Sequence, residues 1–295
     1  MRRRKSGISK LQKKNRAVSA LFLAPSLIGL LVFYVLPFGL VIQYSLVDNP
    51  IAKQFVFLDN YNALFQNASF QQSVGNTLLF SFTAVPLGVV GSLLLACALE
   101  QNIPWKGRFR TIFLSPMMVP VASIVLIWQV FFHQNGIINT LVASGTVKID
   151  WLKSDYGQIV IVSLFVWKNL GYNMVLFMAA LQSIPKDLLE VARIEGAGAW
   201  RIFFRIKLRY LSPTILFVTI LSLISSFKIF REIYLLAGDY PYSSLYLMQH
   251  FMNNMFKSLD YPHISAAALL MLGFMILLIG TLFFAENRYG RDVEE

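Results

Sequence analysis

The sequence is poor in the residue types on which disulfide scaffolds, metal sites and soluble domains depend. Its single cysteine, Cys97, excludes an internal disulfide. His133, His250 and His263 are scattered along the chain, so no Cys/His cluster predicts a metal site, and we expect no metal and no cofactor. Charged residues make up only 14% of the chain and hydrophobic residues 56%, a composition that predicts a membrane protein.

The signatures of an enzyme are also lacking. The sequence contains no Gly-rich phosphate loop of the GxxxxGK[ST] kind, so we expect no ATP binding of that type in this chain. No acid, base, nucleophile or metal set is clustered in the way that a catalytic site requires. The net charge of +11 is confined to short segments between apolar runs, which favours a role in membrane topology over nucleic-acid binding.

What the sequence has is long apolar runs. A helix needs roughly 20 apolar residues to cross a hydrocarbon core of about 30 Å, because every backbone polar group must be satisfied within the helix. Six segments meet this requirement and predict an all-α integral membrane protein with six transmembrane helices. The segments are Ala20 to Tyr44, Val74 to Leu99, Thr111 to Phe132, Gln158 to Leu181, Leu211 to Leu235 and Ile264 to Ala285.

The positions of Lys and Arg predict the orientation, since positively charged short loops are retained in the cytoplasm. With the N-terminus inside, 19 of the 26 basic residues fall on the cytoplasmic side. The apolar run that follows the basic start is too long for a signal peptide and has no small-residue cleavage site. We therefore expect a basic cytoplasmic tail over 1–16, a transmembrane domain over 17–285, and a cytoplasmic C-terminal tail over 286–295.

The longest predicted cytoplasmic loop, residues 183–213, reads SIPKDLLEVARIEGAGAWRIFFRIKLRYLSP. Pro185 suits the first turn of a helix, Asp187 complements its positive end, and Gly196 is placed to end it in a left-handed conformation. A second helix is expected to start near Ala199, with Arg201, Arg205 and Arg209 spaced four apart on one face. From spacing alone, this helix-glycine-helix loop is equally a basic amphipathic hairpin lying on the inner leaflet.

The segment EVARIEGAGAWRIFFRIKL within this loop resembles the signature loop of ABC import permeases. In that family the loop forms the coupling helix that docks into a groove of the ATP-hydrolysing subunit. The resemblance implies that coupling involves Glu190, Ala192, Glu195, Gly196 and Ala197, with Phe203, Phe204 and Leu208 at the downstream apolar positions. Three positions depart from the pattern: Val191 replaces an alanine, Glu195 replaces the usual aspartate, and Arg209 stands where proline is usual.

The resemblance covers most of the chain, from about Leu21 to Ala285. The segments FLAPSLIGLLVFYVLPFGLVIQYSL, WKNLGYNMVLFMAALQSIPKDLLE and FREIYLLAGDYP are similar to the carbohydrate branch, and within it to the first permease subunit, the relative of the larger maltose-transport permease. This implies a subunit of a sugar or oligosaccharide importer in a bacterial or archaeal inner membrane. The implied partners are a second homologous permease, an ATP-binding subunit dimer and an extracellular or periplasmic solute-binding protein.

The same resemblance implies a substrate path along the two spans that flank the loop. Carried over from the maltose permease, the implied residues are Asn169, Tyr172, Ser222, Ser225, Ser226 and Ile229. A tyrosine ring with small polar neighbours suits carbohydrate, because the ring stacks on a sugar face while amides and hydroxyls bond its OH groups. The alternative for the serines is close helix packing, which is common in membranes.

Lys168, Lys228 and Arg231 are unusual, because unpaired charges in hydrocarbon are costly. Lys228 and Glu232 stand four residues apart and are able to pair, which favours a neutral oligosaccharide as substrate; an unpaired Lys228 favours an acidic sugar. Snorkelling of Lys228 and Arg231 to the interface is the simpler alternative. A rival function, a self-sufficient ion-coupled carrier, usually requires an intramembrane acid or histidine, and Glu232 is the only acid within the six predicted spans.

Overall fold

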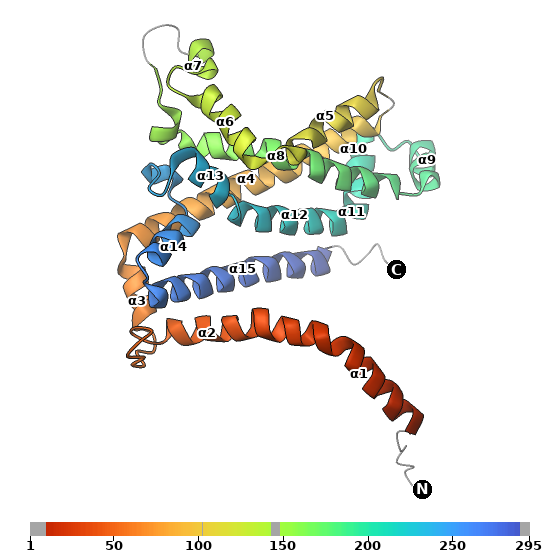
Figure 1. Ribbon diagram of the computed structural model, residues 1–295. Helices are drawn as coiled ribbons and strands as arrows, with labels where there is room; N and C mark the ends of the chain where they lie inside the picture. Colours follow the sequence, from red (N-terminus) through yellow and green to blue (C-terminus); the bar gives the residue numbers. More distant parts are fainter. Residues whose placement is uncertain (1–9, 102, 143–147, 290–295) are drawn as a thin grey trace. The chain divides into compact units, whose positions relative to one another are not determined.

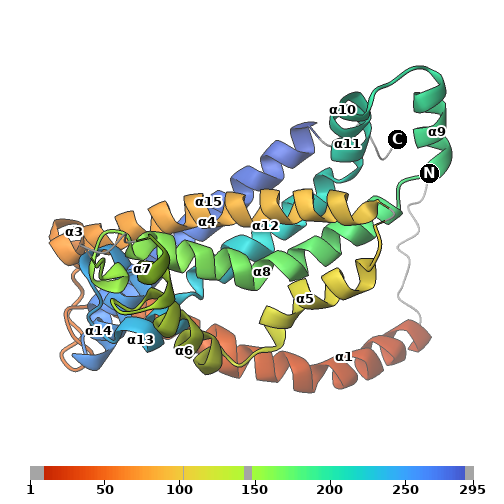
Figure 2. The same cartoon turned by 90° about the horizontal axis from the view of Figure 1, so that it is seen from above.

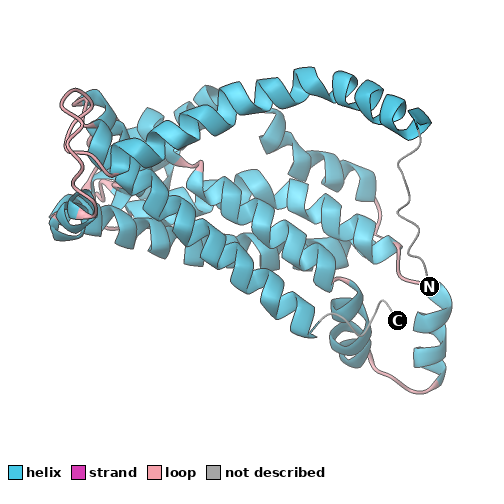
Figure 3. Cartoon of the chain, turned by 90° about the horizontal axis from the view of Figure 1, so that it is seen from below, coloured by secondary structure: helices cyan, strands magenta, loops and turns pink. Residues whose placement is uncertain are grey.

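The computed structural model describes residues 10–101, 103–142 and 148–289. They are largely helical and contain no strand, apart from one isolated antiparallel bridge between Val47 and Phe55 (Figures 1 and 3). The predicted all-α class is therefore confirmed. The α-helices are α1 (Lys10–Leu30), α2 (Leu36–Ser45), α3 (Asp59–Gln66), α4 (Ala68–Glu100), α5 (Lys106–Met118), α6 (Val121–Phe132), α7 (Ile137–Val142), α8 (Gly157–Gln182), α9 (Lys186–Ile194), α10 (Ala199–Ile202), α11 (Leu208–Tyr210), α12 (Ser212–Phe227), α13 (Phe230–Ala237), α14 (Met248–Lys257) and α15 (Tyr261–Tyr289).

Six segments of the described chain are long and apolar enough to cross a membrane, as the sequence predicts. They are Val18–Ser45, Ala68–Glu100, Val121–Leu141, Gly157–Gln182, Ser212–Ala237 and Tyr261–Arg288. Helix α1 begins at Lys10, so the last part of the expected basic tail is helical. Helix α15 continues to Tyr289, past the expected end of the transmembrane domain at residue 285. The first nine and last six residues of the two expected tails lie outside the described residues.

The third predicted span, Thr111 to Phe132, is wrong as a single helix. The structure ends α5 at Met118 and starts α6 at Val121, with Val119 extended at φ −80° and ψ 133°. Proline at position 120 explains the break, because its ring disfavours helical backbone at the preceding residue and it has no N–H to donate. The membrane-length apolar segment starts instead at Val121.

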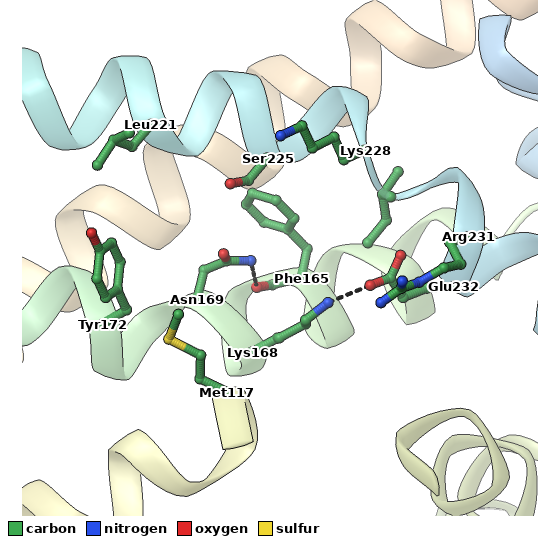
Figure 4. A pocket seen from close by; sticks show the side chains of 11 residues that line it. Met117, Phe165, Lys168, Asn169, Tyr172, Leu221, Ser225, Lys228, Arg231 and Glu232 are labelled. Atoms are coloured by element: carbon green, nitrogen blue, oxygen red, sulfur yellow. Dashed lines mark hydrogen bonds and ion pairs between the residues drawn. The ribbon is translucent and has the colours of Figure 1, made fainter. Parts of the chain in front are cut away.

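The fifth predicted span, Leu211 to Leu235, is also interrupted. Helix α12 ends at Phe227, where the amide of Lys228 bonds the Ser225 carbonyl at 3.1 Å, and α13 begins at Phe230. The ribbon turns between the two helices (Figure 4). No proline or glycine stands at this turn, so local sequence gives no signal for it. Side chains on either side of residues 228 and 229 are therefore not on one continuous helical face.

The described chain divides into two compact units, of which the first comprises residues 10–64 and 259–270. Its long helix passes through a π-helical turn over Leu31–Val35, where the Leu36 amide bonds the Leu31 carbonyl just before Pro37, which lacks an N–H. The Asn60 side chain donates to the carbonyls of Ser45 and Val47, each at 2.9 Å. These bonds hold α3 to the end of α2.

The second unit comprises residues 65–101, 103–142, 148–258 and 271–289. Helix α4 packs along α8 and α12, and α5 packs along α8 (Figure 2). Phe80 and Phe165 meet edge to face at the α4–α8 contact, with ring centroids 5.5 Å apart. Both side chains are buried in the core cluster of this unit. This packing places the polar residues of α8 and α12 that are discussed next.

Candidate functional site

A cavity of about 530 Å³ lies within the second unit, among α5, α8, α12 and α13 (Figure 4). The residues that line it combine an aromatic ring, an amide, a hydroxyl, four charged groups and several apolar side chains. They are Met117, Phe165, Lys168, Asn169, Tyr172, Leu221, Ser225, Lys228, Ile229, Arg231 and Glu232. A largely apolar cavity with a few convergent polar and charged groups is typical of a site that binds a small ligand.

Four of the six residues expected on the substrate path line this cavity: Asn169, Tyr172, Ser225 and Ile229. The Tyr172 side chain is 37% exposed, and within the described chain its hydroxyl makes no hydrogen bond. The Asn169 amide nitrogen bonds the Phe165 carbonyl at 2.8 Å, which leaves the side-chain oxygen available. The structure thus brings these four side chains together; their contact with a substrate stays a prediction.

The other two expected path residues, Ser222 and Ser226, do not line the cavity. Ser222 accepts a 2.9 Å hydrogen bond from the Asn173 amide on α8, and Ser226 bonds Ser81 on α4 at 3.0 Å. Both serines are buried in these helix contacts. They follow the packing alternative, because small hydroxyl residues let neighbouring helices approach and join them by hydrogen bonds. We therefore leave them out of the proposed path.

The intramembrane charges pair differently from the sequence expectation. Glu232 forms its ion pair with Lys168 on α8, and the expected pair with Lys228 is absent from the described chain. The side chain of Glu232 is 6% exposed and that of Lys168 25%. The Lys168 ammonium reaches Glu232 across the cavity wall (Figure 4). The turn at residues 228 and 229 explains the correction, because it removes the helical i, i+4 relation on which the expectation rested.

Sequence reasoning missed several cavity residues, namely Met117, Phe165 and Leu221. Phe165 precedes Asn169 by four residues, and Leu221 precedes Ser225 by four, so helical spacing alone could have identified them. Met117 enters through α5, which was not foreseen as a separate helix. Helix α5 lies against α8 at Gly171, where an added Cβ would stand 1.9 Å from the Phe113 carbonyl oxygen.

The loop over residues 183–213 has the predicted helix-glycine-helix form. Helix α9 ends at Ile194, and Gly196 takes φ +80°, a conformation that glycine adopts without a Cβ penalty. The Gly196 amide bonds the Arg193 carbonyl at 3.0 Å, and the Ala197 amide bonds the Ala192 carbonyl at 2.9 Å. These two bonds make a Schellman motif, with the two alanines as its 6→1 partners.

The second half of the loop is less regular than predicted. Helix α10 starts at Ala199 as expected, but a π-helical segment follows over Phe203–Lys207 before α11. The wider π turn disrupts the spacing of four on which the predicted face of Arg201, Arg205 and Arg209 depends. Lys207 forms an ion pair with Glu100 at the end of α4, at 2.5 Å. This contact holds the loop to the end of a membrane-length helix.

The loop exposes large apolar side chains beside its charges. Ile194 is 85% exposed and Trp200 77%, and Val191 and Phe204 are also exposed. Trp200 and Phe204 stack on one another, with ring centroids 5.9 Å apart and an interplanar angle of 13°. Exposed apolar side chains of this size mark a surface that binds a partner or a membrane. Among the expected coupling residues, Ala192 is buried, whereas Glu190, Glu195 and Gly196 are exposed.

The cavity and the loop both lie in a region that matches a known protein family. Residues 84–289, which include the cavity and the loop, match the family model described as the binding-protein-dependent transport system inner membrane component. The chain belongs to this family. It is a multi-pass membrane protein and the permease subunit of a binding-protein-dependent importer.

Individual relatives agree with this assignment. The permease is 33% identical over 221 residues to the sn-glycerol-3-phosphate transport system permease protein UgpA of Shigella flexneri, covering 72% of this chain and 74% of that one. It is 30% identical to the probable ABC transporter permease protein YurN of Bacillus subtilis, covering 77% and 81%. Its fold matches a chain of the bacterial alginate ABC transporter in complex with an alginate pentasaccharide-bound periplasmic protein, with TM-score 0.83, 20% identity, and coverage of 97% and 99%.

Neither the cavity nor the loop offers a metal site. Within residues 10–101, 103–142 and 148–289, no three His, Cys, Asp or Glu side chains gather in a way that could hold a metal ion. In the cavity, Glu232 is the one acidic side chain among the lining residues, and Lys168 occupies it. What the site can do chemically is therefore to bind polar groups by hydrogen bonds, ring contact and charge.

Proposed function

We propose that this permease moves a sugar or oligosaccharide through the cavity between α8 and α12, driven by ATP that a partner subunit hydrolyses. The observation that carries the proposal is the cavity wall itself, where the Tyr172 ring, the Asn169 amide and the Ser225 hydroxyl come together. An aromatic face packs on the apolar face of a sugar ring, while amides and hydroxyls bond its OH groups. The names of the similar proteins, a permease for the phosphorylated polyol sn-glycerol 3-phosphate and an alginate transporter, support a polyhydroxylated substrate such as a sugar.

The loop over residues 183–213 supplies the contact with the ATPase in this proposal. Its exposed Ile194 and Trp200 provide an apolar docking surface, and the Schellman corner at Gly196 sets the angle between α9 and α10. The pair of Lys207 with Glu100 connects this surface to α4. A movement of the ATPase would therefore be passed to a long membrane helix, as a rigid-body alternation of the transporter requires.

The remaining parts of the proposal follow the topology. The loop lies on the cytoplasmic side, as do both termini, because most basic residues then fall in the cytoplasm. A second, homologous permease completes the pathway, and an extracellular or periplasmic binding protein delivers the sugar. In this arrangement the chain alone has neither a nucleotide site nor a complete path.

The proposal is tested by reconstituting the permease in proteoliposomes with its partner permease, ATPase dimer and cognate binding protein. We expect uptake of labelled oligosaccharide that requires ATP, the binding protein and both permeases, and no ATPase activity from this chain alone. Vesicles supplied with ADP serve as the control. Uptake by the single chain under a proton or sodium gradient would overturn the proposal and support a self-sufficient carrier.

A further inference from the structure

Four charged side chains line the cavity described above, and three of them are cationic. They are Lys168, Lys228, Arg231 and the single acid Glu232. Glu232 is paired with Lys168 in the structure. Within the described residues, Lys228 and Arg231 form no ion pair with any acid. Three basic residues and one acidic residue therefore leave the cavity wall with a formal charge of +2.

The two unpaired cations stand at opposite kinds of helix end. Lys228 stands at the C-cap of α12, where the partial negative charge of the helix end favours a cation. Arg231 stands in the first turn of α13, where the helix end is itself partly positive and a cation is disfavoured. The Ile229 cap makes no side-chain hydrogen bond, and the acid of this first turn, Glu232, is paired with Lys168. The helix dipole thus explains the position of Lys228 in part and does not explain that of Arg231.

Both cations lie within the membrane-length segment Ser212–Ala237. Ionisable side chains within membrane-spanning segments usually face a cavity and find a partner there, because an uncompensated charge in a medium of low dielectric is costly. Both Lys228 and Arg231 are exposed and line the cavity, and the Lys228 ammonium lies beside Ser225 and not toward Glu232 (Figure 4). The described chain holds the cations in the cavity but supplies no anion to them.

We propose that the anion is on the substrate: the permease carries a carbohydrate that bears an oxyanion, and Lys228 and Arg231 bind it during passage. This inference rests on the proposed function and names the substrate class of the same cavity. A carboxylate of a uronic acid and a phosphate ester share the chemistry that two cations recognise. The Lys168–Glu232 pair, being neutral overall, leaves Tyr172 and Asn169 to bind the sugar hydroxyls.

The test measures uptake by the complete reconstituted transporter with three labelled probes offered through the cognate binding protein. The probes are trigalacturonate, the carboxyl-reduced trisaccharide of the same linkage, and sn-glycerol 3-phosphate. We expect ATP-dependent uptake of at least one anionic probe and at least about tenfold less uptake of the neutral one, because a lost charged hydrogen bond is worth roughly 1.5–3 kcal/mol. Comparison of trigalacturonate with glycerol phosphate distinguishes a carboxylate from a phosphate.

Substitutions at Lys228 and Arg231 then test whether these two residues cause the preference for anionic probes. We expect Lys228→Met and Arg231→Met each to lower anionic uptake about tenfold, and Lys228→Arg to retain most of it. Lys148→Met is the matched control, because Lys148 is exposed, bonds Asn135 and does not line the cavity. Each variant is quantified in the membrane before assay, and Lys228→Gln replaces the methionine variant should the latter fail to assemble.

The outcomes separate this inference from the function on which it rests. ATP-dependent uptake of the neutral probe alone, or equal losses for neutral and anionic probes in the Lys228 and Arg231 variants, would overturn the inference and leave a sugar importer. Unchanged anionic uptake in both variants would overturn it as well, and would assign the cations to snorkelling or to an acid of the partner permease. Absence of ATP-dependent uptake for all three probes and for neutral malto-oligosaccharides would remove the proposed function itself.

Discussion

The cavity wall and the loop over residues 183–213 belong to the same compact unit, yet they are built in opposite ways. The loop obtains its form from neighbours in sequence: Ala192, Arg193, Gly196 and Ala197 make the corner among themselves. The cavity wall joins residues from four helices, and its ion pair links positions 64 residues apart. The loop is a local structure that presents a surface, and the cavity wall is a tertiary structure that encloses a space.

The charges of the two regions differ in the same way. Most basic residues of the loop are exposed, where water screens them and pairing adds little. In the cavity, one acid stands among three cations, and which cation it binds determines what charge remains for a substrate. We therefore expect replacement of a charge in the loop to change stability little, and replacement of a charge in the cavity to change packing and, under our proposal, selectivity. Four predictions test this contrast, in order of decreasing effect.

The close approach of α5 to α8, the two helices that carry Met117 and Tyr172, gives the largest expected effect. Gly171→Ala should destabilise the permease by about 3 kcal/mol, because the new Cβ would stand 1.9 Å from the Phe113 carbonyl and force α5 away from α8. Gly91→Ala is the matched control, since its Cβ meets only Leu170 at an ordinary 3.7 Å. The measurement is the unfolding of purified protein in detergent. Equal stability of the two variants would mean that α5 is loosely held.

Removal of the acid from the cavity ion pair comes next. Glu232→Gln should cost about 2 kcal/mol, because it leaves the part-buried Lys168 ammonium without its counter-ion. The double variant Lys168→Met with Glu232→Gln should recover more than half of that loss, since no unpaired charge remains there. Both are measured by unfolding in detergent. A double variant as unstable as the sum of its single changes would show that the two residues do not act as a pair.

The glycine corner tests the loop by a matched pair of substitutions. Gly196→Ala places a side chain at φ +80° and should strain the corner by about 1–2 kcal/mol. Gly198→Ala places the same side chain at φ −70°, where it causes no such strain. An added Cβ has open space at both positions, so the comparison isolates backbone conformation. Gly196→Ala should insert normally but lower the sugar transported per ATP hydrolysed several-fold. Glu190→Ala should uncouple likewise.

If the loop transmits the movement of the ATPase, the Gly196 variant should hydrolyse ATP without a matching rate of transport. Transport and ATP hydrolysis are measured together in proteoliposomes, with Gly198→Ala and the unaltered permease alongside. Equal coupling in the Gly196 and Gly198 variants would assign the corner to folding alone. Full transport in the Glu190 variant would remove that residue from the docking surface.

The smallest expected effect is at the ion pair that joins the loop to α4. Glu100→Gln should cost roughly 0.5 kcal/mol, because Glu100 and Lys207 are both partly exposed, and the cost should shrink as salt rises. The loss caused by Glu232→Gln should depend less on salt, since Glu232 is buried. Asp155→Asn, an exposed acid without a described partner, is the control. Salt-independent loss at Glu100 would place it in a drier environment than its exposure indicates.

Features that depend on nearby residues or on composition could be predicted from the amino-acid sequence alone. Six long apolar runs predict six membrane-length segments, because lipid leaves an extended backbone no hydrogen-bond partner. The corner at Gly196 was predictable, since only glycine takes φ +80° there without cost. The break before Pro120 carried an equally local signal, which the assignment of a single span from Thr111 to Phe132 overlooked.

The cavity, by contrast, depends on how distant helices pack together. The turn after Phe227 contains no proline or glycine from which it could be predicted. It brings Glu232 to Lys168 on α8 and not to Lys228. Ser222 and Ser225 looked alike in sequence, but the neighbouring helices bury the first against Asn173 and leave the second in the cavity. A helix presents polar groups on several faces, and which face lines a space depends on what packs against the others. Among the described residues, that packing leaves Lys228 and Arg231 as the two cavity cations without an ion pair.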